Sequence, residues 1–227
     1  MATQSTRTMA TTCLGLSGDI ALRQDILGVY ANDNPQTRSL KARLTLIQNT
    51  PFVRVALVTI QGSSTANLQR DLDNANQVYQ DECDAWVYCT GSITVNEPSL
   101  LVLNQDDCLG SGHSVSDEED ELFDLGRNLG ANVVGYYING SNFGTNVSGC
   151  AAHPPGRRGF WVNQNAAVYS PWTFAHELTH VVGDNSHVSD TDNLMMGSGT
   201  INITNPPPDL TNTQCNDIVS DTDMESC

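Results

Sequence analysis

The segment from His176 to His187 constrains the fold of this 227-residue chain more than any other part of the sequence. It reads His-Glu-Leu-Thr-His-Val-Val-Gly-Asp-Asn-Ser-His. At 3.6 residues per turn, His176 and His180 fall one turn apart on the same face of a helix and can bind one ion. Glu177 lies about 100° around the helix from His176, beside that ion. The spacing therefore predicts a helix that carries a catalytic metal site.

Residues on either side of the two histidines predict where this helix begins and ends. Ser170-Pro171 is a favourable pair for an N-cap and a first helical turn, and Gly183 can end the helix in a left-handed conformation. The residues between them supply an apolar helix face: Phe174, Leu178, Val181 and Val182. We therefore expect a helix from about Pro171 to Val182.

A catalytic zinc site needs a third protein ligand, and the sequence offers more than one candidate. A turn at Gly183 would bring the following residues back toward the ion, and His187 is the best candidate among them. Asp184 and Asp190 remain alternatives, because carboxylates also bind zinc. A glutamate as third ligand is disfavoured, because the only one downstream is Glu225, close to the C-terminus.

This motif, together with the Asn-Leu-Met sequence that ends at Met195, resembles the metzincin metallopeptidases. Their pattern is His-Glu-x-x-His-x-x-Gly-x-x-His followed by a turn that contains methionine. The family register would place the third histidine at Ser186, so this chain resembles the family with a one-residue insertion after Gly183. From His187 to Met195 the spacing again resembles that of the family.

The resemblance implies a zinc-dependent endopeptidase that hydrolyses peptide bonds through a zinc-bound water. In that reading Glu177 is the general base, and the metal ligands are His176, His180 and His187. Met195 would form the floor beneath the imidazoles in the Met-turn, with Met196 as the alternative in register. Both methionines are also acceptable as ordinary core residues. The alternative function is a non-catalytic or latent zinc-stabilised module that binds proteins.

The expected fold is α/β, with a two-lobed, metzincin-like catalytic domain that spans residues 51–227. It would contain a mixed twisted sheet, the active-site helix and a C-terminal helix after the Met-turn. Periodicity and turn residues predict strands at 53–60, 100–103, 132–138 and 159–163, and helices at 65–82, 117–129 and 210–219. Residues 1–50 fit this pattern less clearly and are expected to be an N-terminal extension or the remnant of a propeptide.

Seven cysteines favour an oxidising compartment, and hence a secreted protein, although the first twelve residues lack the apolar segment of a signal peptide. Proximity in sequence suggests three disulfides: Cys83–Cys89, Cys108–Cys150 and Cys215–Cys227. Cys13 would then be left over. It could be a latency switch on zinc, but a free thiol or an error in the pairing is the simpler explanation.

The charge balance limits the partners of the protein. The chain has 26 acidic and 10 basic residues and a net charge of −16, which disfavours nucleic acid and anionic membranes. No apolar run approaches the roughly 20 residues of a membrane span. Protein or peptide substrates and a monomeric state are expected, and the acidic surface also allows Ca²⁺ sites. His113 and His153 are interpreted as loop residues that make hydrogen bonds.

Overall fold

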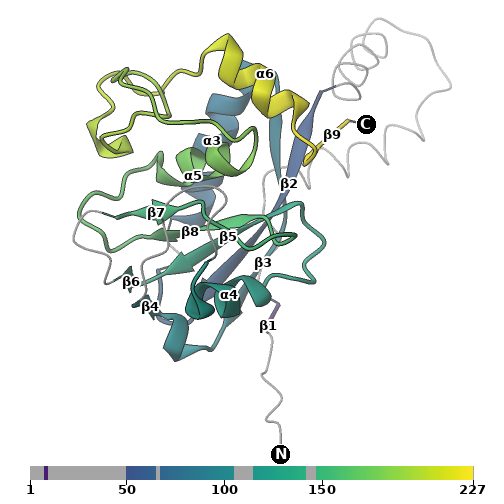
Figure 1. Ribbon diagram of the computed structural model, residues 1–227, viewed down its shortest axis with the longest axis vertical. Helices are drawn as coiled ribbons and strands as arrows, with labels where there is room; N and C mark the ends of the chain where they lie inside the picture. Colours follow the sequence, from purple (N-terminus) through teal and green to yellow (C-terminus); the bar gives the residue numbers. More distant parts are fainter. Residues whose placement is uncertain (1–7, 10–49, 65–66, 105–114, 142–146, 227) are drawn as a thin grey trace, which may run out of the picture.

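A seven-stranded mixed β-sheet forms the centre of the protein (Figure 1). The computed structural model describes residues 8–9, 50–64, 67–104, 115–141 and 147–226. Neighbouring strands follow the order β1-β3-β2-β5-β8-β7, and β9 also pairs with β2. The strands of this sheet are β1 (Thr8–Met9), β2 (Phe52–Ile60), β3 (Trp86–Val95), β5 (Val133–Ile138), β7 (Gly149–Cys150), β8 (Gly159–Asn163) and β9 (Met224–Glu225).

The four central strands β3, β2, β5 and β8 run parallel, whereas β7 pairs antiparallel with β8 at one end of the sheet. A separate two-stranded parallel sheet joins β4 (Val102–Leu103) to β6 (Gly140–Ser141). In the described part of the sheet, β7 is therefore an edge strand, and one of its hydrogen-bonding sides is not used by β8.

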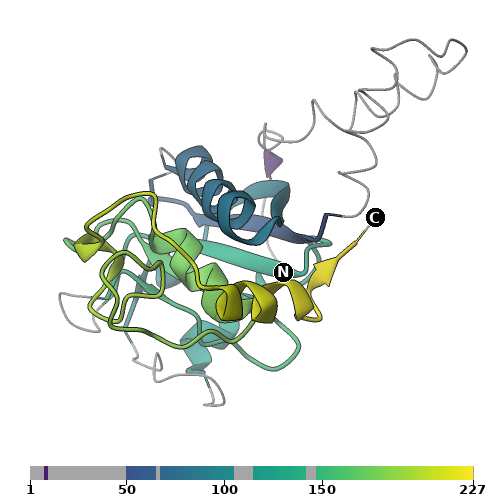
Figure 2. The same ribbon diagram turned by 90° about the horizontal axis from the view of Figure 1, so that it is seen from above.

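Helices cover both faces of the sheet, so that the described residues form three layers (Figures 1 and 2). The helices α3 (Leu68–Cys83), α5 (Thr173–Val181) and α6 (Asn212–Ser220) lie on one side, and α4 (Asp117–Asp124) lies on the other. Short 3-10 helices occur at Pro98–Leu100 and Thr200–Asn202.

Alternate side chains of β2 enter two different hydrophobic cores, as expected for a strand with period two. Val55 and Leu57 pack in the cluster that contains residues of α3, α5 and α6. Val58 and Ile60 pack in the cluster that contains Leu122 and Phe123 of α4. These β2 residues are fully buried, which explains why the sequence of this strand is an almost continuous β-branched run.

The expected α/β class with a mixed sheet is confirmed, and most predicted elements lie close to their predicted positions. The acidic helix is shorter than predicted. It ends at Asp124 and turns at Gly126, where a Cβ atom would lie 2.3 Å from the hydroxyl of Tyr136. The prediction missed β3, because Thr90 and Gly91 interrupt its apolar pattern. Residues 1–50, expected to be an extension, lie outside the described residues except for 8–9 and 50.

Side-chain caps begin two of the helices. Ser116 and Glu119 form the predicted capping box at the start of α4, and the indole Nε1 of Trp161 also donates to the Glu119 carboxylate at 2.9 Å. Thr211 and Gln214 form a second capping box at the start of α6. Both helices therefore begin within two residues of the starts that the sequence predicts.

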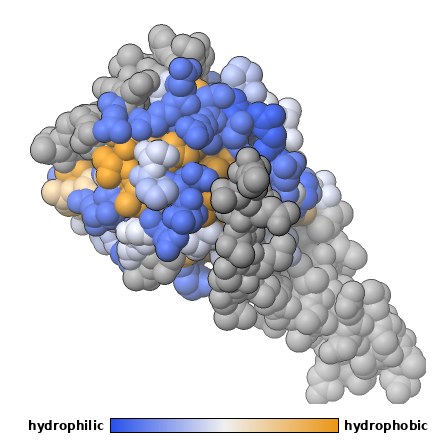
Figure 3. Space-filling view, turned by 90° about the horizontal axis from the view of Figure 1, so that it is seen from below, coloured by the Kyte–Doolittle hydropathy of each residue, from blue (hydrophilic) through white to orange (hydrophobic). Residues whose placement is uncertain are grey.

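The surface of the described chain is largely polar. Figure 3 shows one face on which hydrophilic side chains predominate and apolar ones form a narrower band. Only two large hydrophobic residues of the described segments are exposed, Ile201 and Val219. No helix within these segments is both long enough and apolar enough to cross a membrane.

Candidate metal centre

Helix α5 places His176 and His180 one turn apart, with their ring centroids separated by 4.7 Å. Phe174 and Leu178 on the same helix are completely buried and fix its orientation against the sheet. The helix begins at Thr173, two residues later than predicted, because the hydroxyl of Ser170 accepts a hydrogen bond from Trp172 in a preceding turn. The two histidines remain within the regular part of the helix.

Gly183 ends the helix and reverses the chain. Its φ of +90° lies in the left-handed region, and a Cβ atom here would lie only 2.7 Å from the backbone nitrogen of Ile218. The backbone N–H of Gly183 donates to the Asp221 carboxylate at 3.0 Å. Asp184 continues the left-handed turn with a φ of 48°. These two residues direct the chain back across the end of the helix toward His187.

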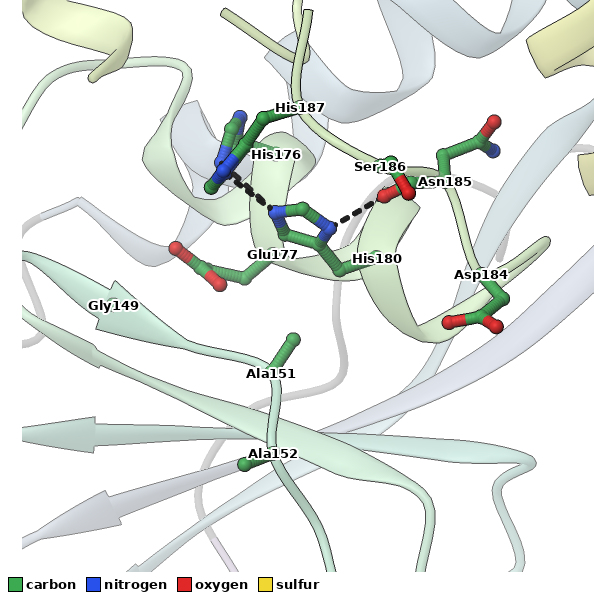
Figure 4. Close-up of a pocket in the computed structure, with 10 residues that line it drawn as sticks. All are labelled: Gly149, Ala151, Ala152, His176, Glu177, His180, Asp184, Asn185, Ser186 and His187. Atoms are coloured by element: carbon green, nitrogen blue, oxygen red, sulfur yellow. Dashed lines mark hydrogen bonds between the residues drawn. The ribbon is translucent and has the colours of Figure 1, made fainter. Parts of the chain in front are cut away.

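The three histidines converge through their Nε2 atoms (Figure 4). The Nε2 atoms are 3.2 Å apart for His176 and His180, 3.1 Å for His176 and His187, and 3.0 Å for His180 and His187. A tetrahedral zinc ion with Zn–N distances of about 2.0–2.1 Å would separate two ligand nitrogens by about 3.3–3.4 Å. The triad therefore has nearly the dimensions that a bound metal requires, and it could hold one.

Backbone carbonyls orient two of these imidazoles from behind. The Nδ1 atom of His176 lies 2.7 Å from the carbonyl oxygen of Leu194, and that of His180 lies 2.6 Å from the carbonyl oxygen of Asn185. A carbonyl can only accept, so each Nδ1 carries the proton and each Nε2 presents its lone pair. This arrangement fixes the tautomer that a metal needs.

The electrostatic environment keeps His176 and His180 neutral. Burial and the neighbouring His180 lower the pKa of His176 to about 3. Burial and the neighbouring His187 lower the pKa of His180 to about 4. Neutral imidazoles are the metal-binding form, so protons compete weakly for these two side chains near neutral pH.

Glu177 lies beside the triad and lines the same pocket (Figure 4). Burial raises the pKa of its carboxyl group to about 8. Gly149 of β7 lies against it, since a Cβ atom at that position would be 2.6 Å from the Glu177 Oε1. Only a residue without a side chain leaves room for the carboxylate here. Glu177 is not part of the group of possible metal ligands.

The pocket in front of the triad has a volume of about 410 Å³. Small residues of β7 and the segment after it, Gly149, Ala151 and Ala152, form one wall. Asp184 lines the pocket without belonging to the histidine group, and Asp190, the other carboxylate considered as a ligand, does not line it. Among the described residues, His187 is thus the side chain that completes the group.

The segment Asn193–Met196 forms a tight turn behind the triad. The backbone N–H of Met196 donates to the carbonyl of Asn193 at 3.2 Å, and the N–H of Met195 donates to the Asn193 side chain at 2.9 Å. Met195 is completely buried and Met196 is 8% exposed. The same turn carries the Leu194 carbonyl that orients His176.

The residues that hold this turn were not predicted from the sequence. The side-chain amides of Asn193 and Gln214 form two reciprocal hydrogen bonds, at 2.9 and 3.1 Å. Gln214 also caps α6, and its backbone carbonyl accepts from the side chain of Asn185 at 3.4 Å. The only signal in the sequence was the Thr-x-x-Gln pattern of the cap, which does not reveal a partner 21 residues earlier.

Helix α3 supports α5 from the side through polar contacts. The hydroxyl groups of Tyr79 and Thr179 are 3.2 Å apart in the core. The buried Asp71 carboxylate accepts hydrogen bonds from Tyr137 and from Tyr169, which precedes the active-site helix. These contacts fix α5 relative to the sheet.

Two predicted disulfides are wrong. Cys83 at the end of α3 is bonded to Cys215 in α6, across a separation of 132 residues, and not to Cys89. The pairing of Cys215 with Cys227 is excluded by the same bond. Proximity in sequence failed because the packing of α3 against α6 decides which sulfurs meet. Cys150 is disulfide-bonded, but Cys108 and Cys13 lie outside the described residues.

Of the remaining histidines, His153 lies outside this pocket. The Nδ1 atom of His153 lies 3.1 Å from the carbonyl oxygen of Pro154, and this residue does not line the cavity. His113 lies outside the described residues.

Comparison with known proteins finds structural similarity at low sequence identity. No protein-family model and no curated protein sequence matches the chain. The crystal structure of an archaemetzincin from Methanopyrus kandleri aligns with a TM-score of 0.46 and 16% identity over 73% of this chain and 92% of that chain. A structure of a chaperone–substrate complex aligns with a TM-score of 0.47 and 16% identity over 66% of this chain, which spans only 28% of that one.

Proposed function

We propose that this protein is a zinc-dependent endopeptidase of the metzincin type. The observation that carries the proposal is the convergence of three imidazole nitrogens within 3.0–3.2 Å, with a buried carboxylate beside them. Structural zinc sites are closed by four protein ligands, whereas catalytic sites leave a position open. Among the described residues this group has only the three histidines, and it opens into a pocket.

His176, His180 and His187 would hold the zinc ion. When bound, zinc supplies Lewis acidity, which acidifies a coordinated water and polarises a substrate carbonyl. Glu177 accepts a proton from the attacking water while the water oxygen forms its bond to the carbonyl carbon. Glu177 then delivers that proton to the amine nitrogen as the C–N bond breaks. The raised pKa of Glu177, about 8 without metal, is compatible with a group that both takes and returns a proton.

The substrate would be a protein or a peptide. Gly149 of β7 lies directly beside Glu177, and Gly149, Ala151 and Ala152 line the pocket. A bound zinc ion would polarise the carbonyl oxygen of a peptide bond, and Glu177 lies in the same pocket, where it can move the protons that hydrolysis requires.

The experiment combines metal analysis with cleavage of a denatured protein, using the wild type, Glu177→Ala and His187→Ala. The proposal predicts one zinc per chain and cleavage that a chelator abolishes. Glu177→Ala should keep zinc and lose cleavage, and His187→Ala should lose both. His153→Ala and Glu121→Ala are matched controls outside the pocket and should behave as the wild type.

The same measurements separate the alternative function. A wild type that binds zinc but cleaves nothing, and that is unchanged by Glu177→Ala, would indicate a zinc-stabilised protein-binding module. Retention of zinc by His187→Ala would place the third ligand elsewhere. Either result would contradict the proposed peptidase site.

We also propose that the protein functions outside the cytosol as a monomer. The Cys83–Cys215 bond is compatible with an extracellular location, because such bonds persist in oxidising compartments. Calcium binding stays a prediction from the acidic composition. Equilibrium sedimentation of the purified protein would test the monomeric state, and a calcium titration would test calcium binding.

A further inference from the structure

We infer that Asp184 makes the pocket selective for substrates with a lysine or arginine side chain close to the scissile bond. This inference rests on the proposed peptidase function and assigns a specificity to the same site. The relevant feature is an exposed carboxylate in the wall of a pocket whose other described lining residues are small, uncharged polar or part of the proposed catalytic group.

Among the described residues that line the pocket, Asp184 is the one exposed carboxylate. Ten described residues line the pocket, and of these only Glu177 and Asp184 carry carboxylates. Glu177 is 7% exposed and lies beside the metal ligands, whereas Asp184 is exposed. None of these ten residues is Lys or Arg, so a cationic side chain would meet no like charge from them apart from the bound metal.

Arg158, which contacts the end of α5, is engaged by groups other than Asp184. The guanidinium of Arg158 contacts the Val181 carbonyl at the end of α5 and the Asp221 carboxylate, and it forms an ion pair with Asp223. Within the described residues, no ion pair involves Asp184. Its charge is therefore available to a ligand.

The backbone holds the Asp184 carboxylate in a defined place. The backbone N–H of the preceding residue, Gly183, donates a hydrogen bond to the Asp221 carboxylate. The carbonyl of the following residue, Asn185, accepts a hydrogen bond from His180, and its side chain donates one to the Gln214 carbonyl. Aspartate tolerates the left-handed φ of 48° better than most residues. The turn after Gly183 thus holds the Asp184 carboxylate in a fixed place. Binding of a substrate there would cost less side-chain and loop entropy than binding to a carboxylate on a mobile loop.

The space in front of Asp184 suits a long side chain. Figure 4 shows the carboxylate directed toward the region between His180 and the Ala151–Ala152 wall, with Glu177 on the other side of His180. Methyl groups are the largest side chains on that wall. The aliphatic stem of a lysine or arginine could cover this wall while its charge reaches Asp184. The net charge of −16 adds long-range attraction for cationic peptides.

Cleavage-site mapping tests the inference. The zinc-loaded wild type, Asp184→Asn and Asp81→Asn would each digest a denatured protein, with the products identified by mass spectrometry. Asparagine also tolerates the left-handed conformation, so Asp184→Asn removes the charge alone. Asp81→Asn on the exposed surface of α3 changes the net charge equally, away from the pocket.

We expect Lys and Arg to be enriched within two residues of the bonds that the wild type and Asp81→Asn cleave. For a peptide pair that differs only by Arg or Gln at the enriched position, Asp184→Asn should reduce the preference in kcat/KM about five-fold. High salt should reduce it in the wild type. Cleavage without basic enrichment, or a preference unchanged in Asp184→Asn, would overturn the inference and leave the peptidase function standing.

Binding to zinc-loaded Glu177→Ala gives a second readout that needs no turnover. The probes are alanine-based hexapeptides with a single Arg or Gln placed at each position in turn. Tighter binding of the Arg peptides, about five-fold and lost in the Glu177→Ala/Asp184→Asn double variant, would support the inference even if the wild type cleaves nothing. Equal binding of Arg and Gln peptides would overturn it.

Discussion

The amide pair of Gln214 and Asn193 gives the sharpest test of how the turn at Asn193–Met196 is held. We expect Gln214→Met, which keeps a similar shape, to destabilise the metal-free protein by about 2–4 kcal/mol. The side chain of Gln214 makes two bonds to Asn193 and accepts one from the backbone of Thr211. Each bond contributes about 1 kcal/mol, and the Nδ2 group of Asn193, a residue only 2% exposed, would lose its acceptor, although the Oδ1 atom keeps its bond from the Met195 N–H. Thr211 is exposed and can regain water.

Urea unfolding of the metal-free protein measures this cost, with Gln77→Met on the exposed face of α3 as the control. The control should stay within about 0.5 kcal/mol of the wild type. Because the same turn carries the Leu194 carbonyl that orients His176, Gln214→Met should also weaken zinc binding about ten-fold. A zinc titration against a competing chelator would measure that loss.

A double-mutant cycle with Asn193→Leu decides whether the pair acts as a unit. In the double variant neither amide of the pair is left without the other, and the loss of the Met195 acceptor is common to Asn193→Leu and the double variant, so the double variant should cost at least about 1 kcal/mol less than the sum of the single variants. Additivity within about 0.5 kcal/mol, or a Gln214→Met variant as stable as the control, would refute the reasoning.

Three further predictions concern the site and its support. Gly149→Ala should keep zinc but lower cleavage strongly, because the new Cβ would displace the Glu177 carboxylate; zinc analysis beside a peptidase assay checks this. Replacing Cys83 and Cys215 together by serine should destabilise the protein by roughly 3–5 kcal/mol, which thermal unfolding measures, because the bond closes a long loop. Burial raises the pKa of Glu177 from 4.5 to about 8 without metal, so its contribution to stability is present below about pH 4.5 and lost as the pH rises toward 8. Urea unfolding of the metal-free protein should show this loss as a fall, between about pH 4.5 and 8, in the stability of the wild type relative to Glu177→Gln, because the opposing contributions of His176 and His180 are common to both proteins.

Local patterns predicted those parts of the protein whose physical cause is local. The β-branched run of β2 predicted a buried strand, because a central parallel strand is covered on both faces. Ser116 and Glu119 predicted the start of α4, since a capping box involves only neighbouring residues. The histidine spacing predicted that His176 and His180 share a helix face for the same reason.

Contacts between distant elements were beyond the reach of these patterns. The sequence placed His187 after a turn but left Asp184 and Asp190 open as alternatives, because the path of the turn depends on Asp221 and α6. The pairing of Cys83 with Cys215 depends on how two helices pack.

The sequence by itself determined the helix, its two histidines and the adjacent carboxylate, because helical geometry follows from the backbone. The tertiary structure alone decided which side chain completes the group, what holds the turn behind it and which acid faces the pocket. These features depend on contacts such as that of Gln214 with Asn193, whose partners are brought together only when the core is packed.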